Sequence, residues 1–444
     1  MKQNVTIDKQ SESAIKTGPN LSHDGRGIAI IEGKTTFVSG ALPGEEITYR
    51  ITQKHRQYNE AALIALSTPS AERTTPPCEH FGVCGGCSLQ HMSTNLQLKM
   101  KEATLLEQLK HFGKVVPEKV LPPLNGPTTG YRYKARLGVK YVIKKGKLLV
   151  GFREKSSRYL ADLNRCAVLH PKVGEHLHEL SELIASLLQY FHIPQIEVAM
   201  SDEAAGLVFR HMNPLPQGDK VKLAAFGEKH QFHIYLQPNP PEPVTLLTPQ
   251  QESLFLSYTL PEEDLRLKFH PLDFTQINLA MNRLMIKQAM DLLDPTHDET
   301  VLDLFCGIGN FTLPLAKRAK AVTGIEGSHE MTTRALMNAH DNNLQNVAFY
   351  AANLQDTALN APWLKQSYDK ILLDPPRAGA IEILPRVLHF KAKRIVYISC
   401  NPATLARDAG ELVHQYHYKL KYAGIMNMFP HTSHIEAMAV FDKE

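Results

Sequence analysis

The chain has 444 residues, of which 43% are hydrophobic, and a formal net charge of +4 at pH 7. This length exceeds what one hydrophobic core usually supports, so we expect two or three domains. No apolar run approaches the roughly 18 residues of a membrane-spanning helix, and residues 1–17 are too polar for a signal peptide. We therefore expect a cytoplasmic protein in which the six cysteines serve as metal ligands or in catalysis rather than as disulfides.

The first 65 residues contain short alternating runs, separated by glycine and proline, at 27–31, 35–38 and 46–50. Such a pattern is typical of a small β-barrel. Pro69, Pro76 and Pro77 then indicate a domain boundary.

A cysteine cluster follows that boundary: Cys78, Cys84 and Cys87 lie within ten residues, and Cys166 follows at a distance. Thiolates are soft metal ligands, and the glycines between them allow the loop to wrap around an ion or a cluster. Four sulfurs suit either zinc or a [4Fe-4S] cluster, and the spacing does not separate the two. His80 or His91 could replace one thiol. We expect a structural rather than a redox role.

After a predicted helix at 96–110 comes a strongly basic segment. Residues 131–160 hold ten lysines and arginines against one acidic residue, with tyrosines and a phenylalanine between the charges. Basic and aromatic side chains together suit phosphate neutralisation and base stacking, although a solvated hairpin with a basic turn would look similar. We favour RNA binding, with candidate contacts at Tyr131, Arg132, Tyr133, Lys134 and Arg136.

From residue 300 the pattern becomes strand, loop and helix in alternation, with strands predicted at 301–305, 321–325, 370–373 and 394–398. This alternation predicts a parallel sheet covered by helices on both faces. Ligands of such sheets bind beyond the carboxyl ends of the strands.

A glycine-containing loop, 306–310, follows the first of these strands and resembles a cofactor loop that lacks the third glycine of a dinucleotide site. Glu326 ends the second strand, where its carboxylate could accept hydrogen bonds from ribose hydroxyls. Asn353, after the apolar run 347–350, could contact an adenine edge. Together these features indicate an adenosine-containing cofactor.

Two further motifs carry possible catalytic groups. Asp374 ends the third strand and is followed by two prolines, a turn found in AdoMet-dependent methyltransferases that act on bases. Cys400 ends the fourth strand and is our candidate nucleophile, although a free cysteine is more often a small buried hydrophobe. Glu436, in the segment 428–436, is a candidate general base or else a surface charge.

These motifs together resemble the uracil-C5 RNA methyltransferases, and most closely their iron-sulfur members that act on 23S ribosomal RNA. The resemblance covers nearly the whole chain and rests on the segments 37–44, 78–87, 273–278, 305–311, 373–377, 399–408 and 429–436. It implies a multi-domain protein: a TRAM-like, OB-like β-barrel at 1–66, a central α+β iron-sulfur domain at 67–268, and a Rossmann-like α/β methyltransferase domain at 269–444. Within the central range, about 94–123 is expected to pack with the methyltransferase domain.

The resemblance also implies specific roles. A [4Fe-4S] cluster would be held by the four cysteines named above, and Cys400 and Glu436 would be nucleophile and base. S-adenosyl-L-methionine (AdoMet) would be bound by Gln276, Phe305, Asn310, Glu326, Asn353 and Asp374. The expected substrate is a uracil flipped out of single-stranded or loop RNA, and the expected state is a monomer.

The chemistry explains these residue types, because C5 of uracil is too weak a nucleophile to take a methyl group unaided. A thiolate adding to C6 would activate it, and a base would then remove the C5 proton. One alternative is a TRAM-containing radical-AdoMet methylthiotransferase, which the cysteine spacing disfavours. Another is a non-catalytic RNA-binding protein with structural zinc, which leaves the motifs at 374 and 400 unexplained.

Overall fold

The computed structural model describes residues 15–239, 242–250, 253–356, 358 and 360–443. The chain forms two compact units. The first unit contains the chain up to Phe81, residues 87–104 and the distant segment 430–433. The second unit contains residues 82–86, residues 105–429 and the chain from His434 onward. Residues 1–14 of the predicted barrel lie outside the described residues.

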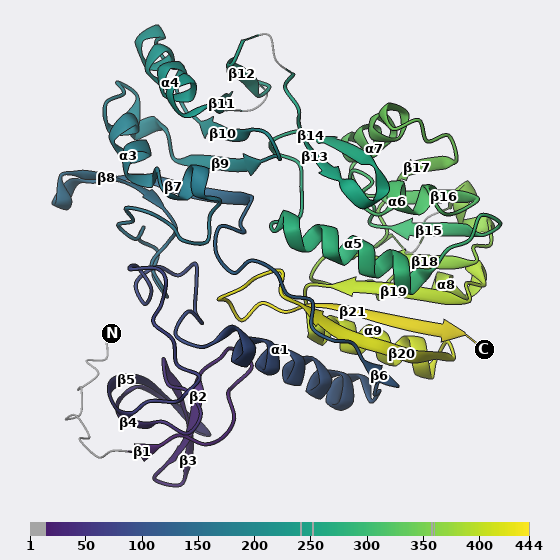
Figure 1. The fold of residues 1–444 in the computed structure, drawn as a ribbon, viewed down its shortest axis with the longest axis horizontal. Helices are drawn as coiled ribbons and strands as arrows, with labels where there is room; N and C mark the ends of the chain where they lie inside the picture. The colour runs from purple at the N-terminus through teal and green to yellow at the C-terminus, as the bar shows by residue number, and fades with distance from the viewer. Residues whose placement is uncertain (1–14, 240–241, 251–252, 357, 359, 444) are drawn as a thin grey trace. The chain divides into compact units, whose positions relative to one another are not determined.

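The first unit contains a five-stranded sheet in the order β1-β4-β5-β3-β2 (Figure 1). Its small core includes Val38, Ile47 and Ala61. The buried carboxylate of Glu45 joins this sheet to the segment that follows it, because it accepts hydrogen bonds from Leu42 N at 2.7 Å and from Arg73 Nη2 at 2.7 Å. The strands are β1 (Ile15–Lys16), β2 (Gly27–Ile31), β3 (Lys34–Ser39), β4 (Glu46–Lys54) and β5 (Tyr58–Thr68).

Helix α1 (Thr94–Gln108) begins in the first unit. There its Gln97 accepts a hydrogen bond from His431 N at 2.8 Å, and the carbonyl of His431 accepts from Ser88 N and Leu89 N, both at 2.9 Å. The segment 430–433 is thereby fixed within the first unit although it comes from near the end of the sequence.

The second unit contains a six-stranded sheet in the order β12-β11-β10-β9-β7-β8. Helix α3 (Leu177–Ala185) packs on β8, and α4 (Gln217–His230) packs on β11. A separate hairpin, β13 and β14, follows this sheet. Bounds are β7 (Lys134–Val142), β8 (Lys147–Gly151), the short helix α2 (Pro171–Gly174), β9 (Gln195–Met200), β10 (Ala205–Arg210), β11 (Phe232–Gln237), β12 (Thr245–Thr248), β13 (Leu256–Leu260) and β14 (Leu265–Phe269).

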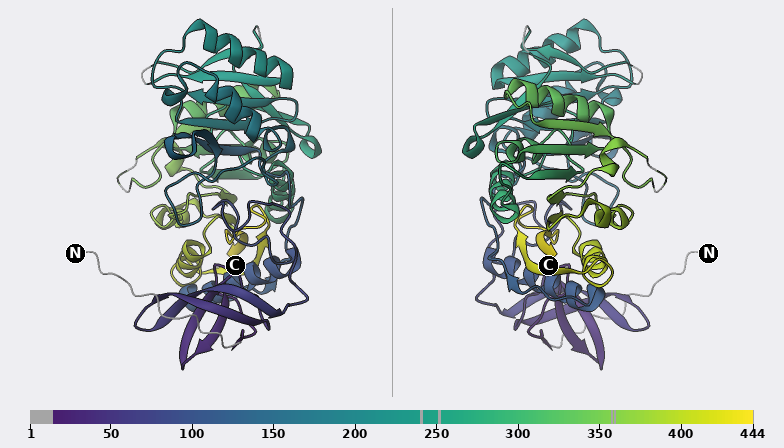
Figure 2. Two further views of the ribbon diagram at one scale, coloured as in Figure 1. Left: turned by 90° about the vertical axis from the view of Figure 1, so that its left-hand side faces the viewer. Right: turned by 90° about the vertical axis from the view of Figure 1, so that its right-hand side faces the viewer.

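The same unit also contains an eight-stranded sheet, which is separate from the six-stranded sheet (Figure 2). Its strand order is β17-β16-β15-β18-β19-β21-β20-β6. Strands β15 to β19 are parallel, whereas β21 runs antiparallel between β19 and β20. These strands are β6 (Lys119–Val120), β15 (Thr300–Leu304), β16 (Ala321–Glu326), β17 (Val347–Ala351), β18 (Lys370–Leu373), β19 (Arg394–Ser399), β20 (Tyr418–Met426) and β21 (Glu436–Lys443).

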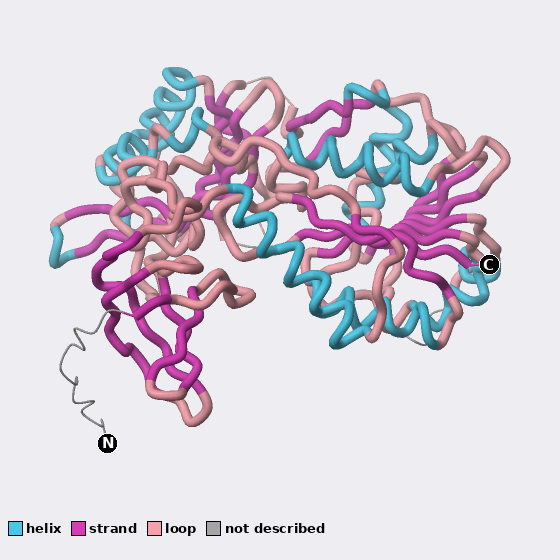
Figure 3. The backbone as a smooth tube through the Cα atoms, turned by 60° about the horizontal axis from the view of Figure 1, so that its bottom comes forward, coloured by secondary structure: helices cyan, strands magenta, loops and turns pink. Residues whose placement is uncertain are grey.

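Helices lie on both faces of this sheet (Figure 3). Its central strands β15 and β19 are almost wholly buried, as expected for parallel strands covered on two sides. The helices are α5 (Leu279–Leu293), α6 (Thr312–Ala316), α7 (His329–Asp341), α8 (Leu384–Phe390) and α9 (Pro402–His414). In the described part of the chain, helices fall short of the length and hydropathy that crossing a membrane requires.

Candidate active site

The carboxyl ends of the parallel strands carry the predicted site residues to one edge of the eight-stranded sheet. Phe305 follows β15, Asp374 follows β18 and Cys400 follows β19. Strand β21 runs antiparallel to β19, and its second residue, Ala437, pairs with Ser399 at the end of β19. Glu436, the first residue of β21, therefore lies at this same edge beside the end of β19. Strand direction and register therefore bring a thiol and a carboxylate together from positions 36 residues apart in the sequence.

These ends surround a cavity of about 590 Å³, a volume within the range of small-molecule sites. Of the residues predicted from the sequence, seven line it: Gln276, Phe305, Glu326, Asn353, Asp374, Cys400 and Glu436. The wall also includes apolar and aromatic side chains that the sequence did not single out, Phe274, Met331, Leu354 and Phe429.

The loop after β15 has the conformation that close approach to a ligand requires. Phe305 has φ +69°, a strained value for a residue with a side chain, and Gly309 has φ +91°. A Cβ added to Gly309 would lie 2.4 Å from Leu313 Cδ1 of α6, and the φ of Gly309 is one that other residues rarely adopt, so glycine is favoured here. The main-chain N–H groups of Phe305 and Cys306 donate to the carbonyl of Ile325 and tie this loop to β16.

Glu326 is held in place by the loops on both sides of it. Its carboxylate accepts hydrogen bonds from Gly307 N at 3.2 Å and from Ser328 N at 3.1 Å. A carboxylate has about four acceptor positions, so capacity remains for hydroxyl donors from a ligand in the cavity.

Asn310 is not among the residues that line the cavity. Its side-chain oxygen accepts from Tyr258 OH at 2.8 Å and from Asn282 Nδ2 at 3.0 Å, and its amide nitrogen donates to Asn282 Oδ1 at 2.9 Å. These bonds hold the Asn310 side chain against Tyr258 and Asn282, so Asn310 anchors the loop 305–309 on the side away from the cavity.

Three acidic groups that line the cavity, Asp374, Cys400 and Glu436, have raised pKa values. Burial raises the pKa of Asp374 to about 7. Burial, with added repulsion from Asp374, raises the pKa of Glu436 well above its usual value, and Arg377 partly offsets the rise. Burial and the neighbouring Glu436 and Asp374 carboxylates raise the pKa of the Cys400 thiol to about 11, again partly offset by Arg377.

Arg377 and His434 are functional candidates that the sequence analysis did not select, although both lie in motifs it recognised. Arg377 is a cation that lines the cavity and opposes the effect of burial on both Cys400 and Glu436. His434 also lines the cavity, and its ring lies 5.5 Å from that of Phe429. Gln276 donates a long hydrogen bond, 3.5 Å, to Asp374 Oδ2.

The five RNA-contact candidates are not equally placed. Tyr131 is only 3% exposed, so its ring is not on the surface where a base could stack on it. The ammonium of Lys134 donates to the carbonyls of Pro271 and Asp273, both at 2.6 Å, and burial lowers its pKa to about 8. Arg136 is well exposed and pairs with Glu197 at 2.6 Å.

A groove of about 530 Å³ runs beside β7 and shares Phe274, Gln276 and Phe429 with the walls of the cavity. Its lining includes Arg132, Lys134, Arg136 and Arg210, so it offers positive charge next to the site. Tyr133 does not line it; its ring packs at the edge of the adjoining core.

Among the described residues, the four cluster cysteines form no disulfide. Cys78 belongs to the first unit, where its N–H donates to Gln90 Oε1 at 3.2 Å, and Cys87 lies in the same unit. In the second unit, Cys84 pairs as a β-bridge with Glu154, and its Sγ accepts from Gly86 N at 3.4 Å. Cys166 is buried in that unit, with its N–H bonded to Gly174 O.

Comparison with known proteins gives the family of the chain. Residues 95–444 match the family model described as tRNA (Uracil-5-)-methyltransferase. The fold is similar to the crystal structure of the Pyrococcus abyssi tRNA (uracil-54, C5)-methyltransferase in complex with S-adenosyl-L-homocysteine, with a TM-score of 0.74 and 23% identity over 97% of this chain and 100% of that one. The fold is thus that of a methyltransferase, and the chain belongs to the tRNA (uracil-5-)-methyltransferase family.

Curated relatives narrow the comparison within that family. The 23S rRNA (uracil(1939)-C(5))-methyltransferase RlmD of Alcanivorax borkumensis is 51% identical over 423 residues, which is 95% of each chain. The protein of the same name from Hahella chejuensis is 50% identical over 429 residues, 96% of each chain.

Proposed function

We propose that this protein is an AdoMet-dependent methyltransferase that converts a uracil of 23S ribosomal RNA to 5-methyluridine. The observation that carries the proposal is the pairing of a thiol, Cys400, with a buried carboxylate, Glu436, at the edge of a methyltransferase sheet. Relatives with about half of their residues identical, over nearly their whole length, bear the name of that activity.

The cavity fits AdoMet. Its glycine-containing loop permits close approach, Glu326 suits the ribose hydroxyls, Asn353 suits the adenine edge, and Phe305 and Met331 offer apolar surface. Gln276 and Asp374 complete the proposed set. When bound, AdoMet supplies an electrophilic methyl group. Asn310 remains a proposed member of this set, and it also supports the loop through its bonds to Tyr258 and Asn282.

In the proposed mechanism the Cys400 thiolate adds to C6 of the uracil, forming a C–S bond and placing an enolate electron pair at C5. C5 would then take the methyl group of AdoMet as the S–CH3 bond breaks, leaving S-adenosyl-L-homocysteine, and would become tetrahedral. Glu436 removes the remaining C5 proton, the C5–C6 double bond re-forms, and the thiolate leaves. Arg377 favours both ionised states, because its positive charge lowers the pKa of each group.

The target uracil must leave its stack to reach Cys400, which favours an unpaired region of the RNA. The exposed guanidinium of Arg136, with Arg132 and Arg210 along the adjoining groove, would neutralise flanking phosphates.

We assign the chain a monomeric state and the domain ranges 1–66, 67–268 and 269–444.

We also propose that the four cysteines hold a [4Fe-4S] cluster. The donor set is suitable because thiolates are soft ligands, and Cys84 Sγ accepts a main-chain hydrogen bond from Gly86, a feature that tunes cluster sulfurs. The cluster would contribute structure rather than methyl transfer.

The experiment that tests the function uses 23S rRNA containing 5-fluorouridine. Fluorine at C5 cannot be removed as a proton, so the native protein with AdoMet should form a stable covalent complex with this RNA. Peptide mapping should place the bond at Cys400, and Cys400→Ala should form none.

Two controls decide the interpretation. RNA with fluorine at C5 of cytidine instead of uridine should give no complex if the enzyme is specific for uracil. A native protein that binds both AdoMet and RNA but forms no complex would contradict the uracil mechanism.

A further inference from the structure

Two pairs of adjacent residues connect the loop 305–310, which we call the cofactor loop, to the six-stranded sheet. One pair, Tyr258 and Thr259, lies on β13, and the other, Asn282 and Arg283, lies on α5. Within each pair, one side chain bonds to Asn310 and the other to Asp202. Alternation along β13 explains this for the first pair, because Tyr258 is buried whereas Thr259 is on the opposite face.

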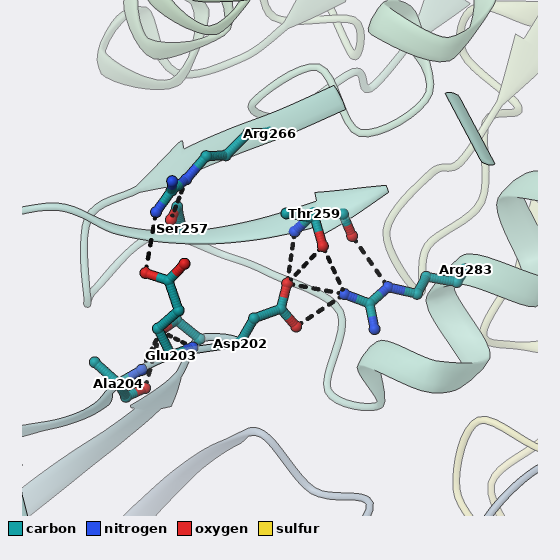
Figure 4. A network of polar contacts seen from close by, with 8 residues as sticks. Asp202, Glu203, Ala204, Ser257, Thr259, Arg266 and Arg283 are labelled. Atoms are coloured by element: carbon teal, nitrogen blue, oxygen red, sulfur yellow. Dashed lines mark hydrogen bonds and ion pairs between the residues drawn. The ribbon is translucent and has the colours of Figure 1, made fainter. Parts of the chain in front are cut away.

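The contacts to Asp202 come from both elements (Figure 4). Thr259 donates to its Oδ2 from both N and Oγ1, each at 2.8 Å. Arg283 Nη2 lies 2.8 Å from Oδ1 and 2.9 Å from Oδ2, and Arg283 Nε donates to the Thr259 carbonyl at 3.0 Å. Although burial opposes it, these hydrogen bonds lower the pKa of Asp202, so the carboxylate is ionised at neutral pH.

The contacts on the cofactor side are buried. Tyr258 and Asn282 together hold both ends of the Asn310 amide. A further amide, Asn338 of α7, donates to the carbonyl of Ile308 at 3.2 Å and to that of Lys268 on β14 at 3.0 Å. The loop 305–310 is therefore bonded on its inner side to the same hairpin that holds Asp202.

Asp202 in turn belongs to the turn between β9 and β10. Strand β9 pairs with β7, where Arg136 lies opposite Glu197, and β10 ends at Arg210 of the basic groove. The sheet also packs directly on the hairpin, because a Cβ at Gly206 would lie 2.9 Å from Leu256 Cδ1. The strands that line the basic groove are thus fixed to the hairpin through this turn.

We propose that Asp202 and Arg283 are positioning residues that hold the RNA-contacting sheet and the cofactor loop in one frame, so that the target base meets the methyl donor in line. This inference rests on the proposed function. A displacement of about 1 Å in reacting groups can cost roughly 100-fold in rate. The junction would therefore affect the chemical step rather than the affinity for either ligand.

The test is single-turnover methylation with saturating AdoMet and RNA. We expect Asp202→Asn and Arg283→Gln each to slow the step at least about tenfold, with the dissociation constants of AdoMet and RNA each within about twofold of native. The matched control is the neighbouring pair Glu203 and Arg266, which joins the same turn to the same hairpin but has side chains 73% and 54% exposed. Glu203→Gln and Arg266→Gln should leave the rate unchanged.

Unchanged rates in both junction variants would overturn the inference. So would a slower rate accompanied by equal weakening of AdoMet or RNA binding, because the residues would then support binding and not alignment. If either variant fails to fold, Thr259→Val removes one hydroxyl donor to Asp202 and should slow the step by a smaller factor, and no slowing would contradict the proposal. A native protein that does not methylate rRNA would instead refute the proposed function.

Discussion

Glu436 combines full burial with a position next to the nucleophile. We predict that Glu436→Gln, which keeps the shape but removes the base, lowers turnover by about 10²–10⁴-fold. Proton removal would be blocked after methyl transfer, so a covalent complex should accumulate with ordinary uridine RNA. Denaturing gel electrophoresis with labelled RNA measures this directly.

The double variant Glu436→Gln, Cys400→Ala separates the two roles. It should give no covalent complex. A Glu436→Gln protein that turns over at the native rate would exclude this carboxylate as the base.

The raised pKa of Cys400 predicts how its reactivity depends on pH. With a pKa of about 11, the thiolate fraction of the free protein should rise about tenfold per pH unit between pH 7 and 10. Alkylation of Cys400 by iodoacetamide, followed by mass spectrometry, should show that slope. Arg377→Gln should slow alkylation at every pH in this range, because Arg377 lowers the pKa of the thiol.

Cys306 provides the internal reference for this measurement, because it is only 3% exposed and should resist alkylation in the folded protein. A rate for Cys400 that levels off between pH 7 and 8 would show that the thiolate already forms there, contrary to the prediction.

At the scale of secondary-structure elements, the loop between β15 and α6 depends on a glycine conformation. Gly309→Ala must place a Cβ at φ +91° and within 2.4 Å of Leu313 Cδ1. We expect it to cost about 1–3 kcal/mol of unfolding free energy and to weaken AdoMet binding. Urea unfolding and isothermal calorimetry measure the two effects.

Gly218→Ala is the matched control, since Gly218 is in a helix and an added Cβ would meet nothing within 4 Å. It should change stability by less than about 1 kcal/mol. Equal effects of the two substitutions would mean that the loop adapts to a side chain at 309.

The strands were predictable where burial on both faces leaves a continuous apolar run. The predicted strands 301–305, 321–325, 370–373 and 394–398 agree with β15, β16, β18 and β19 to within one residue. By contrast, the hairpin β13–β14 was not predicted from the sequence, because each strand has only five residues and its role depends on contacts with distant parts of the chain.

The candidate site was predictable from strand ends but not from the packing behind them. Asp374 and Cys400 each follow a strand, so sequence order places them at one edge. Asn310 lies at the end of the glycine-containing loop. Its partners Tyr258 and Asn282 come from elements that are distant in the sequence, and no local pattern predicts that they lie near it. Tyr131 illustrates the same limit, because a tyrosine among basic residues suits either a surface or a core.

At the scale of the whole molecule, the metal content of the purified protein shows whether the four cysteines hold zinc or a [4Fe-4S] cluster. We predict about four iron and four sulfide per chain in anaerobically purified protein, and no stoichiometric zinc. Cys84→Ser should lose most of the iron and unfold at a lower urea concentration than native. Elemental analysis and the visible absorption of the cluster provide the readouts.

Cys306→Ser, which alters a buried thiol outside this set, should keep the native iron content. One zinc per chain with no iron would contradict the cluster assignment but leave the methyltransferase proposal intact.

The place of β21 has a consequence for biosynthesis. This strand lies between β19 and β20, and residues 436–443 that form it are made after every other strand of the sheet. Until they emerge from the ribosome, β19 and β20 lack the neighbour that joins them, and the proposed base cannot reach the site. A nascent chain that has not yet placed residues 436–443 in the sheet therefore has no competent site and cannot modify RNA.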